Sequence, residues 1–232
     1  MALLEAPDFA RLRDRMVERQ LLERGIRSAA VLEAMRRVAR EHFLPPDLEA
    51  LAYDDTPLPI ADAQTISQPY IVALMIEALE LRGGEQALEV GTGSGYAAAV
   101  LAQIAGEVYT VERIGQLAEK AADALRRLGL KNVHVLHGDG TLGWSEHAPY
   151  DAIIVAAGAP HVPAALTEQL AIGGRLVIPV GPDPQVQELV RVVRLAPSQY
   201  RRETLADVRF VPLLGEQGWT PLPRAPRLIP SG

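Results

Sequence analysis

The sequence predicts an α/β fold with a mainly parallel central sheet. From residue 87 onward, short β-branched or apolar runs alternate with helical patterns, which is typical of βαβ units around a sheet that is buried on both faces. A glycine-rich turn, Gly91–Gly95, lies between the first of these runs and the helical pattern that follows it. After Gly181 two runs succeed each other with no helical pattern between them, which predicts an antiparallel end to the sheet.

Helices are expected at the start of the chain. Asp8 and Ser28 are suitable N-caps, and Gly25 suits the end of the first helix. The apolar residues recur at helical spacing, as Phe9, Leu12, Met16 and Leu21 and then as Val31, Leu32, Met35 and Val38. Prolines between residues 45 and 59 predict an irregular segment after these two helices.

Pro69 predicts the start of a third helix, because its missing N–H has no intrahelical partner in the first turn. The hydroxyl of Ser67 could cap this helix, and Gly83 and Gly84 are expected to end it. Further helices are expected at about 95–105, 114–128 and 163–171. Strands are expected at Ala87–Val90, Val108–Glu112, Val133–His137, Ala152–Ala156, Arg175–Val180, Leu189–Leu195 and Val208–Leu213.

We expect one domain over residues 1–232. It would consist of an N-terminal helical or lid extension at 1–80, a core at 81–215 and a proline-rich tail at 216–232, in which residues 221–232 carry four prolines. A hydrophobic fraction of 48% and a charged fraction of 22% are those of an ordinary globular protein. No basic region followed by an apolar core opens the chain, so we expect a cytoplasmic protein that does not bind membranes.

Composition excludes several kinds of chemistry. The chain has no cysteine, which rules out thiolate catalysis and cysteine-based metal sites. His134 and His137 lie three apart on an expected strand and point to opposite faces, so we expect no metal site. The formal charge of −6 argues against non-specific nucleic-acid binding, which depends on neutralising phosphates with Lys and Arg.

The glycine-rich turn predicts a nucleotide-type cofactor, although a tight turn without any ligand is the simpler alternative. A dinucleotide fingerprint would need glycine at position 96, where the chain has Tyr96. Glu89, two residues before the first glycine, would repel a pyrophosphate but attract the sulfonium and ammonium of S-adenosylmethionine. At ~4 Å and an effective dielectric constant near 20, such an attraction amounts to about 4 kcal/mol before desolvation is subtracted. The charge therefore favours S-adenosylmethionine over NAD.

Two more acids are found at the ends of the next two expected strands. Glu112 ends the second strand, where an acid can accept hydrogen bonds from both ribose hydroxyls. Asp139, between Gly138 and Gly140, is placed to contact an adenine amino group. A solvated strand end and an ordinary turn are the alternatives. Ligands of open α/β sheets bind at the carboxyl ends of the strands, so three acids there favour a binding site.

These residues resemble the protein-L-isoaspartate O-methyltransferase family from about residue 15 to 215. The matching segment Gln64–Tyr70 contains Thr65-Ile66-Ser67-Gln68-Pro69, the most specific part of the resemblance, since the glycine turn alone indicates only a methyltransferase. The other matching segments are Pro57–Ile60, Leu88–Gly95, Gly138–Gly140, Pro149–Ile153, Gly173–Gly181 and Val208–Leu213. The chain departs from the family pattern at Ala61–Ala63, Gly158 and Leu214.

The resemblance implies a Rossmann-like, S-adenosylmethionine-dependent methyltransferase fold with extra N-terminal helices. It further implies S-adenosyl-L-methionine as the methyl donor, S-adenosyl-L-homocysteine as the product, and the α-carboxylate of L-isoaspartyl residues in damaged proteins as the acceptor. The methyl ester can cyclise to a succinimide, which makes the reaction a repair step. The alternatives are a small-molecule methyltransferase on the same fold and a catalytically silent donor-binding module.

The resemblance also assigns residues to roles. Ser67 matches the active-site serine of the family, and we expect its hydroxyl to orient the acceptor oxygen. Cofactor contacts are expected from Gln64, Thr65, Ile66, Ser67, Glu89, Gly91, Thr92, Gly93, Gly95, Glu112, Asp139 and Gly140. Substrate contacts are expected from Ala157, Gly158, Pro160 and Val211, and the protein is expected to act as a monomer.

Overall fold

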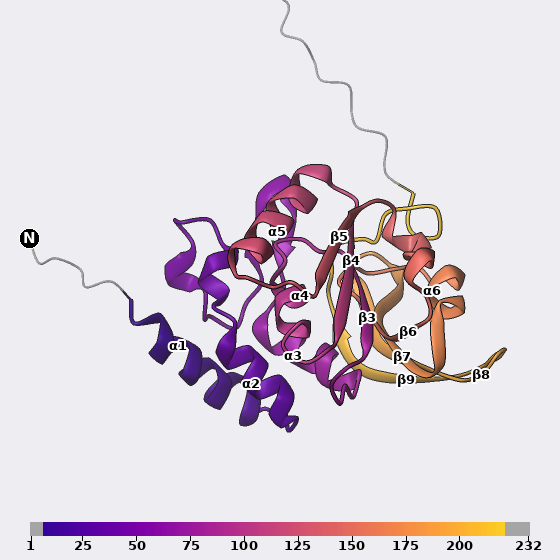
Figure 1. Ribbon diagram of the computed structural model, residues 1–232, viewed down its shortest axis with the longest axis horizontal. Coiled ribbons are helices and arrows are strands. Elements are labelled where there is room, and N and C mark those ends of the chain that lie inside the picture. The colour runs from indigo at the N-terminus through magenta and orange to yellow at the C-terminus, as the bar shows by residue number, and fades with distance from the viewer. Residues whose placement is uncertain (1–6, 221–232) are drawn as a thin grey trace, which may run out of the picture.

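The computed structural model describes residues 7–220, and within that range the central sheet has seven strands in the order β5-β4-β3-β6-β7-β8-β9 (Figure 1). The strands β5, β4, β3, β6 and β7 pair in parallel, and β8 and β9 complete the sheet by antiparallel pairing. Their bounds are β3 (Gln86–Val90), β4 (Glu107–Glu112), β5 (Val133–His137), β6 (Tyr150–Val155), β7 (Leu170–Asp183), β8 (Val186–Ala196) and β9 (Gln199–Val208). The predicted mainly parallel sheet with an antiparallel end is confirmed.

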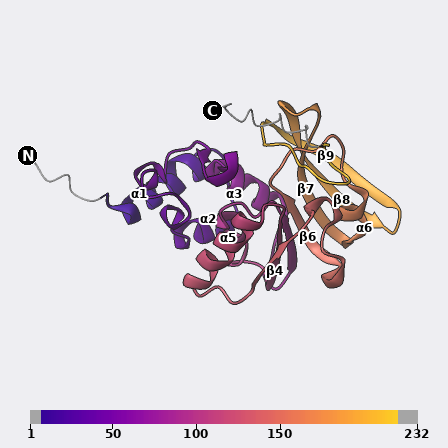
Figure 2. The ribbon, with the colours of Figure 1, turned by 90° about the horizontal axis from the view of Figure 1, so that it is seen from above.

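Helices cover both faces of this sheet, and alternation along the strands explains why. In β6, Ala152 and Ile154 belong to one buried cluster, whereas Ile153 and Val155 belong to the other. The first cluster packs under the N-terminal helices together with α3, α4 and α5, and the second packs under α6 (Figure 2). The helices are α1 (Phe9–Arg15), α2 (Ala29–Arg37), α3 (Pro69–Ala78), α4 (Tyr96–Leu101), α5 (Gly115–Arg127) and α6 (Ala164–Glu168).

The predicted caps of the N-terminal helices are present. Asp8 accepts a hydrogen bond from the backbone N–H of Arg11 at 3.1 Å, and Ser28 accepts one from that of Val31 at 3.4 Å. The first helix continues beyond α1 as a π-helical turn, η1 (Met16–Leu22), and Gly25 follows it with a φ of +104°. Pro69 is the first residue of α3, as predicted.

Three expectations about the elements are wrong. Ser67 does not cap α3: the cap residue is Gln68, and Asp55 accepts the hydrogen bond from the Tyr70 N–H at 3.2 Å. The helix ends at Ala78 rather than at Gly83 and Gly84. Glu80 then takes a φ of +52°, and ion pairs to Arg175 and Arg191 at 2.6 and 2.7 Å hold its carboxylate there.

The third wrong expectation is the last strand. The strand predicted at Val208–Leu213 is instead β9, which ends at Val208. Its sequence is mostly polar because it forms the edge of the sheet and most of its side chains are exposed, so it lacks the apolar run that marked the other strands. Residues 209–213 run beside the sheet, with a single bridge between Pro212 and Gly158.

The irregular segment predicted after the first helices contains a small two-stranded sheet, β1 (Leu58–Pro59) with β2 (Thr65–Ile66). The short turn between them, η4 (Ala61–Ala63), has Asp62 and Ala63 at positive φ. The proline-rich run predicted at 221–232 lies outside the described residues. Between residues 7 and 220, no helix combines the length and the apolar character that crossing a bilayer would require.

Candidate active site

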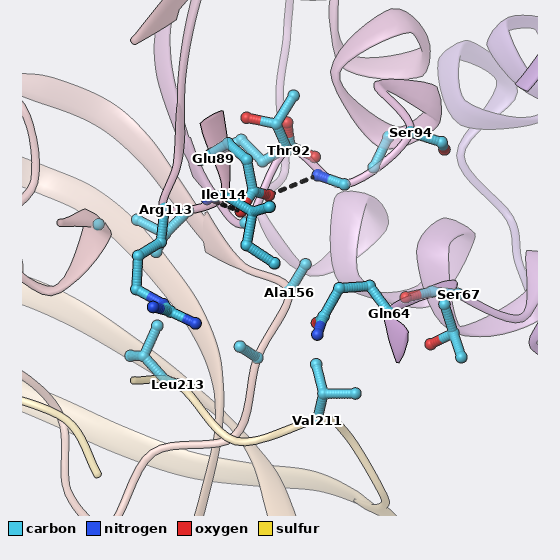
Figure 3. A pocket seen from close by; sticks show the side chains of 18 of the residues that line it. Gln64, Ser67, Glu89, Thr92, Ser94, Arg113, Ile114, Ala156, Val211 and Leu213 are labelled. Atoms are coloured by element: carbon cyan, nitrogen blue, oxygen red, sulfur yellow. Dashed lines mark hydrogen bonds between the residues drawn. The ribbon is translucent and has the colours of Figure 1, made fainter. Parts of the chain in front are cut away.

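A pocket opens at the carboxyl ends of β3 and β4 (Figure 3). The segment around Gln64 and Ser67 forms one side, Val211 and Leu213 lie across from Glu89, and Ala156 lies between them (Figure 3). The lining residues are Ala63, Gln64, Thr65, Ile66, Ser67, Val72, Glu89, Val90, Gly91, Thr92, Gly93, Ser94, Tyr96, Ala97, Val111, Glu112, Arg113, Ile114, Gly140, Ala156, Ala157, Val211, Pro212, Leu213 and Leu214. Most of the predicted site residues therefore meet in one place.

The glycine turn after β3 adopts a backbone that other residues rarely reach. Gly91, Gly93 and Gly95 have φ values of +92°, +54° and +90°. Gly91 and Gly93 line the pocket, as predicted. Gly95 does not: it is the N-cap of α4, and a Cβ there would touch α5 at 3.4 Å. The role of Gly95 is thus to let α4 approach α5 closely.

Glu112, at the end of β4, ties the two loops of the pocket together. Its carboxylate accepts hydrogen bonds from the backbone N–H groups of Gly93 and Ile114, each at 2.9 Å. The side chain is buried, yet it lies in the pocket wall. A carboxylate has about four acceptor positions, so Glu112 keeps acceptor capacity for the hydroxyls of a ligand.

Glu89 is a buried acid with an unused acceptor. Only 1% of the residue is exposed, and one carboxylate oxygen accepts a hydrogen bond from the Thr110 hydroxyl at 2.5 Å. The hydroxyl oxygen of Thr110 is in turn 2.6 Å from that of Thr92, so the three side chains form a hydrogen-bonded series. The other carboxylate oxygen, Oε1, has no hydrogen-bond partner among the residues the structure describes.

The pKa of Glu89 is raised to about 8, mainly by burial and also by the negative charge of Glu112, whereas the hydrogen bond from Thr110 acts in the opposite direction. A buried acid with an unpaired oxygen is unfavourable unless a ligand compensates it. A cation in the pocket would supply that compensation, whereas a pyrophosphate would not. The residues present therefore fit the positively charged S-adenosylmethionine.

Asp139 follows β5 but is not among the lining residues, whereas the adjacent Gly140 is. Its carboxylate accepts hydrogen bonds from the Thr141 N–H at 2.9 Å, the Thr141 hydroxyl at 2.7 Å and the Glu216 N–H at 2.8 Å. Asp139 therefore shapes the loop beside the pocket. The predicted contact of its carboxylate with adenine stays a prediction.

A second cavity of about 660 Å³ adjoins the first. It is lined by Pro57, Thr65, Ser67, Gln68, Ile71, Ala156, Pro184, Gln185, Asp207, Val208, Arg209, Phe210, Val211 and Pro212. Thr65, Ser67, Ala156, Val211 and Pro212 line both cavities. Ser67 thus lies at the boundary between a pocket suited to a cofactor and a cavity large enough for a second molecule.

The four predicted substrate residues separate into two pairs. Ala157 and Val211 line the first pocket, whereas Gly158 and Pro160 line neither cavity. Gly158 acts through its backbone: its N–H donates to the Val211 carbonyl at 2.8 Å, and its carbonyl accepts from the Leu213 N–H at 2.7 Å. It therefore holds the strip of chain at 211–213 against the site.

Sequence reasoning missed several lining residues. Arg113 and Ile114 directly follow Glu112, so the position of the β4 end could have indicated them. Leu213 and Leu214 reach the pocket only because the chain folds back after β9, which no local pattern reveals. No group of three or more His, Asp or Glu side chains within the described range is placed to hold a metal ion.

The fold and the pocket together define a Rossmann-like methyltransferase that uses S-adenosylmethionine. The model of the family described as protein-L-isoaspartate(D-aspartate) O-methyltransferase matches residues 12–218. The chain belongs to this family.

Relatives and solved structures agree with this assignment. The chain is 63% identical over 226 residues to protein-L-isoaspartate O-methyltransferase 1 of Rhodopseudomonas palustris strain HaA2, covering 96% of this chain and 92% of that protein. It is 58% identical over 215 residues to protein-L-isoaspartate O-methyltransferase 2 of Marinobacter nauticus, covering 93% of this chain and 98% of that protein.

Among solved structures, a protein-L-isoaspartate O-methyltransferase superposes with a TM-score of 0.79 at 30% identity, covering 89% of this chain and 67% of that chain. A Plasmodium falciparum protein of the same description, solved with S-adenosyl-L-homocysteine, gives a TM-score of 0.76 at 28% identity, covering 87% of this chain and 98% of that chain. The predicted family and fold are confirmed.

Proposed function

We propose that the protein transfers the methyl group of S-adenosyl-L-methionine to the free α-carboxylate of L-isoaspartyl residues in damaged proteins and peptides. The observation that carries the proposal is the position of Ser67 between the two adjoining cavities. A donor in the first cavity and an acceptor in the second would meet beside this residue. The family membership of the chain supports the same reaction.

The first pocket would hold the donor, which supplies an electrophilic methyl group on a sulfonium. Glu89 would face the positive charge with its unpaired oxygen, and Glu112 would accept hydrogen bonds from hydroxyls of the donor. Gly91 and Gly93 allow the backbone to approach the ligand closely. The predicted cofactor contacts of Gln64, Thr65 and Ile66 fit this arrangement because these residues line the same pocket.

The acceptor needs positioning rather than activation. A carboxylate with an ordinary pKa near 4 is already ionised at neutral pH, so no strong general base is required to create the nucleophile. Holding two reactants in line can contribute about 7–11 kcal/mol of barrier lowering. The hydroxyl of Ser67 would serve as the hydrogen-bond donor that orients the acceptor oxygen.

The second cavity would hold the peptide. Its only charged lining residues within the described range are Asp207 and Arg209, and the rest of its wall is apolar or uncharged. Such a wall suits a substrate whose neighbouring residues vary, because damage can arise in any sequence context. The proposed partner is accordingly a damaged protein or peptide. The proposal includes action as a monomer in the cytoplasm, without nucleic acid or membrane as a partner.

The test compares two peptides of the same sequence, one with an L-isoaspartyl linkage and one with a normal aspartyl linkage. We expect radiolabel from S-adenosylmethionine to enter only the isoaspartyl peptide, as an alkali-labile methyl ester. Equal labelling of both peptides, or labelling of small carboxylic acids alone, would support a small-molecule methyltransferase instead. Donor binding without any transfer in a single-turnover reaction with stoichiometric protein would support a silent module.

A further inference from the structure

A buried arginine, Arg40, contacts both the Ser67 backbone and the ring of Tyr96. Arg40 lies in the short helix η2 (Arg40–Phe43), far from the glycine turn in sequence, and its exposure is 0%. An arginine is rarely fully buried unless its charge is paired. Within the described residues Arg40 forms no ion pair with a carboxylate, so its burial needs another explanation.

The guanidinium of Arg40 is satisfied by backbone carbonyls. Its Nε donates to the Ala52 carbonyl at 2.7 Å, and Nη1 donates to the Ser67 carbonyl at 3.0 Å. A third and longer contact joins Nη2 to the Thr56 carbonyl at 3.5 Å. The planar fork of arginine can bind several acceptors in fixed directions, whereas a lysine ammonium is a point charge on a flexible stem. The contacts therefore fix the direction of the Ser67 backbone as well as its distance.

The other side of the Arg40 guanidinium faces the ring of Tyr96. Its guanidinium carbon is 5.1 Å from the centre of the Tyr96 ring, within the range of a cation–π interaction. Tyr96 is the first residue of α4, directly after the glycine turn, and it lines the first pocket. Phe43, from the same short helix as Arg40, contacts the Tyr96 ring edge-on at 5.6 Å between ring centres. Two residues of η2, Arg40 and Phe43, therefore hold the Tyr96 ring in place.

We propose that Arg40 is a positioning residue that sets the Ser67 backbone relative to the start of α4, and hence the acceptor relative to the donor. This inference rests on the proposed function for its catalytic consequence. Arg40 itself is not expected to touch either reactant, because it lines neither cavity. Its effect would pass through Ser67 on one side and Tyr96 on the other.

The variants are Arg40→Lys, which keeps the charge, and Arg40→Met, which removes it. In methyl transfer to an isoaspartyl peptide, we expect Arg40→Met to lower kcat by about 10²-fold, the effect of a displacement near 1 Å. Arg40→Lys should recover part of that loss because it can still donate to the Ser67 carbonyl. The Kd for S-adenosylhomocysteine, measured by calorimetry, should change far less than kcat in both variants.

The matched control is Val38→Ala. Val38 lies two residues before Arg40 and is buried in the cluster that also contains Phe43 and Tyr96. Removing its methyl groups should weaken the packing without touching Ser67. We expect this variant to lower the melting temperature while keeping the wild-type kcat at temperatures well below unfolding. Equal losses of kcat in Val38→Ala and Arg40→Met at matched stability would overturn the proposal, as would a wild-type kcat in Arg40→Met.

A second measurement does not depend on the substrate. With S-adenosylhomocysteine bound, hydrogen–deuterium exchange of the peptide spanning residues 64–68 should become faster in Arg40→Met than in Val38→Ala. Unchanged exchange would overturn the positioning role even if the wild-type protein proved to methylate another acceptor. If the exchange result held but no isoaspartyl peptide were methylated, the proposed function would fail while the role of Arg40 stood. Failure of both Arg40 variants to fold would assign Arg40 to the folding core and overturn the proposal.

Discussion

The hydroxyl of Thr110 on β4 donates a hydrogen bond to the carboxylate of Glu89 on the neighbouring strand β3, at 2.5 Å. Both residues are buried, and the pair lies beneath the glycine turn that forms one wall of the pocket. One oxygen of Glu89 is thereby fixed, and the other, Oε1, has no hydrogen-bond partner among the described residues. The relationship explains how an acid can be kept dry and oriented before any ligand arrives.

The first prediction concerns the pH dependence of donor binding. Burial raises the pKa of Glu89 to about 8, so the side chain holds a proton at neutral pH without ligand. A cation favours the ionised form, so binding of S-adenosylmethionine should release a proton and tighten as pH rises from 6 to about 8. Calorimetry in two buffers of different ionisation enthalpy would measure this release. Glu89→Gln should abolish it and weaken binding, and identical heats in both buffers for the wild type would contradict the prediction.

Whereas donor binding should tighten as the pH rises, the contribution of Glu89 to the stability of the unliganded protein should decrease. The pKa of Glu89 is higher in the folded protein than its ordinary value of 4.5, so the folded state binds more protons between that value and about 8. The contribution of Glu89 to the free energy of unfolding therefore falls as pH rises through this window. The free energies of unfolding of wild type and Glu89→Gln, obtained from denaturation curves, should therefore depend on pH with different slopes in this window. Parallel pH profiles would show that Glu89 has an ordinary pKa.

The second prediction tests the role of Thr110. Thr110→Val keeps the shape of the side chain but leaves both oxygens of Glu89 without a donor, and this should lower the free energy of unfolding by about 1–3 kcal/mol. Thr110→Ser keeps the hydroxyl and is the matched control, with a smaller loss from the missing methyl group. Urea denaturation measures both. A Val variant less destabilised than the Ser variant would show that the hydrogen bond to Glu89 contributes nothing.

The third prediction concerns Ser67. Because its side chain would orient the acceptor, Ser67→Ala should reduce kcat with an isoaspartyl peptide by about tenfold or more, while the Kd for S-adenosylhomocysteine changes far less. Stability should change little, because Ser67 is half-buried and does not cap α3. Ser67→Thr is the comparison that keeps a hydroxyl at the site. Wild-type turnover in Ser67→Ala, measured by radiolabelled methyl transfer, would remove Ser67 from the mechanism.

The fourth prediction concerns Gly158, where the chain departs from the family pattern. A Cβ at this position would lie 2.6 Å from the side-chain amide carbon of Gln187. Gln187 cannot move away freely, since its amide oxygen accepts the Phe210 N–H at 2.7 Å. Gly158→Ala should therefore lower the free energy of unfolding by about 1–3 kcal/mol through overpacking.

Two further variants isolate the cause of that loss. Gly138→Ala is the control, because a Cβ there would meet only ordinary contacts at 3.7 Å or more. Combining Gly158→Ala with Gln187→Ala should be less destabilising than the sum of the single changes, because the shorter side chain makes room for the new methyl group. Strict additivity of the two free energies would show that Gln187 does not clash with position 158.

Much of the architecture could be predicted from local patterns. The caps Asp8 and Ser28, the start of α3 at Pro69 and the parallel strands are set by residues that act within one turn or one strand, so the sequence displays them directly. The edge strand β9 could not be found this way. Its polar residues become a strand only by pairing with β8.

Part of the site could likewise be predicted from the sequence, and part could not. Glu89 and Glu112 lie at the carboxyl ends of the neighbouring parallel strands β3 and β4, and the glycine turn follows β3. Parallel strands end at the same edge of a sheet, so the meeting of these residues could be predicted. The cap of α3 could not. Asp55, rather than the nearby Ser67, accepts the hydrogen bond from the first turn, and this frees Ser67 to face the cavities.

The sequence by itself determined the fold class, the family and two acids that line the pocket, Glu89 and Glu112, because each depends on residues close together in the chain. Only the tertiary structure decided that Ser67 borders two cavities, that Gly95 packs against α5, and that Arg40 spans from Ser67 to Tyr96. Those relationships join segments far apart in sequence. They arise when the N-terminal helices bury their apolar faces against the sheet and bring Arg40 to the back of the site.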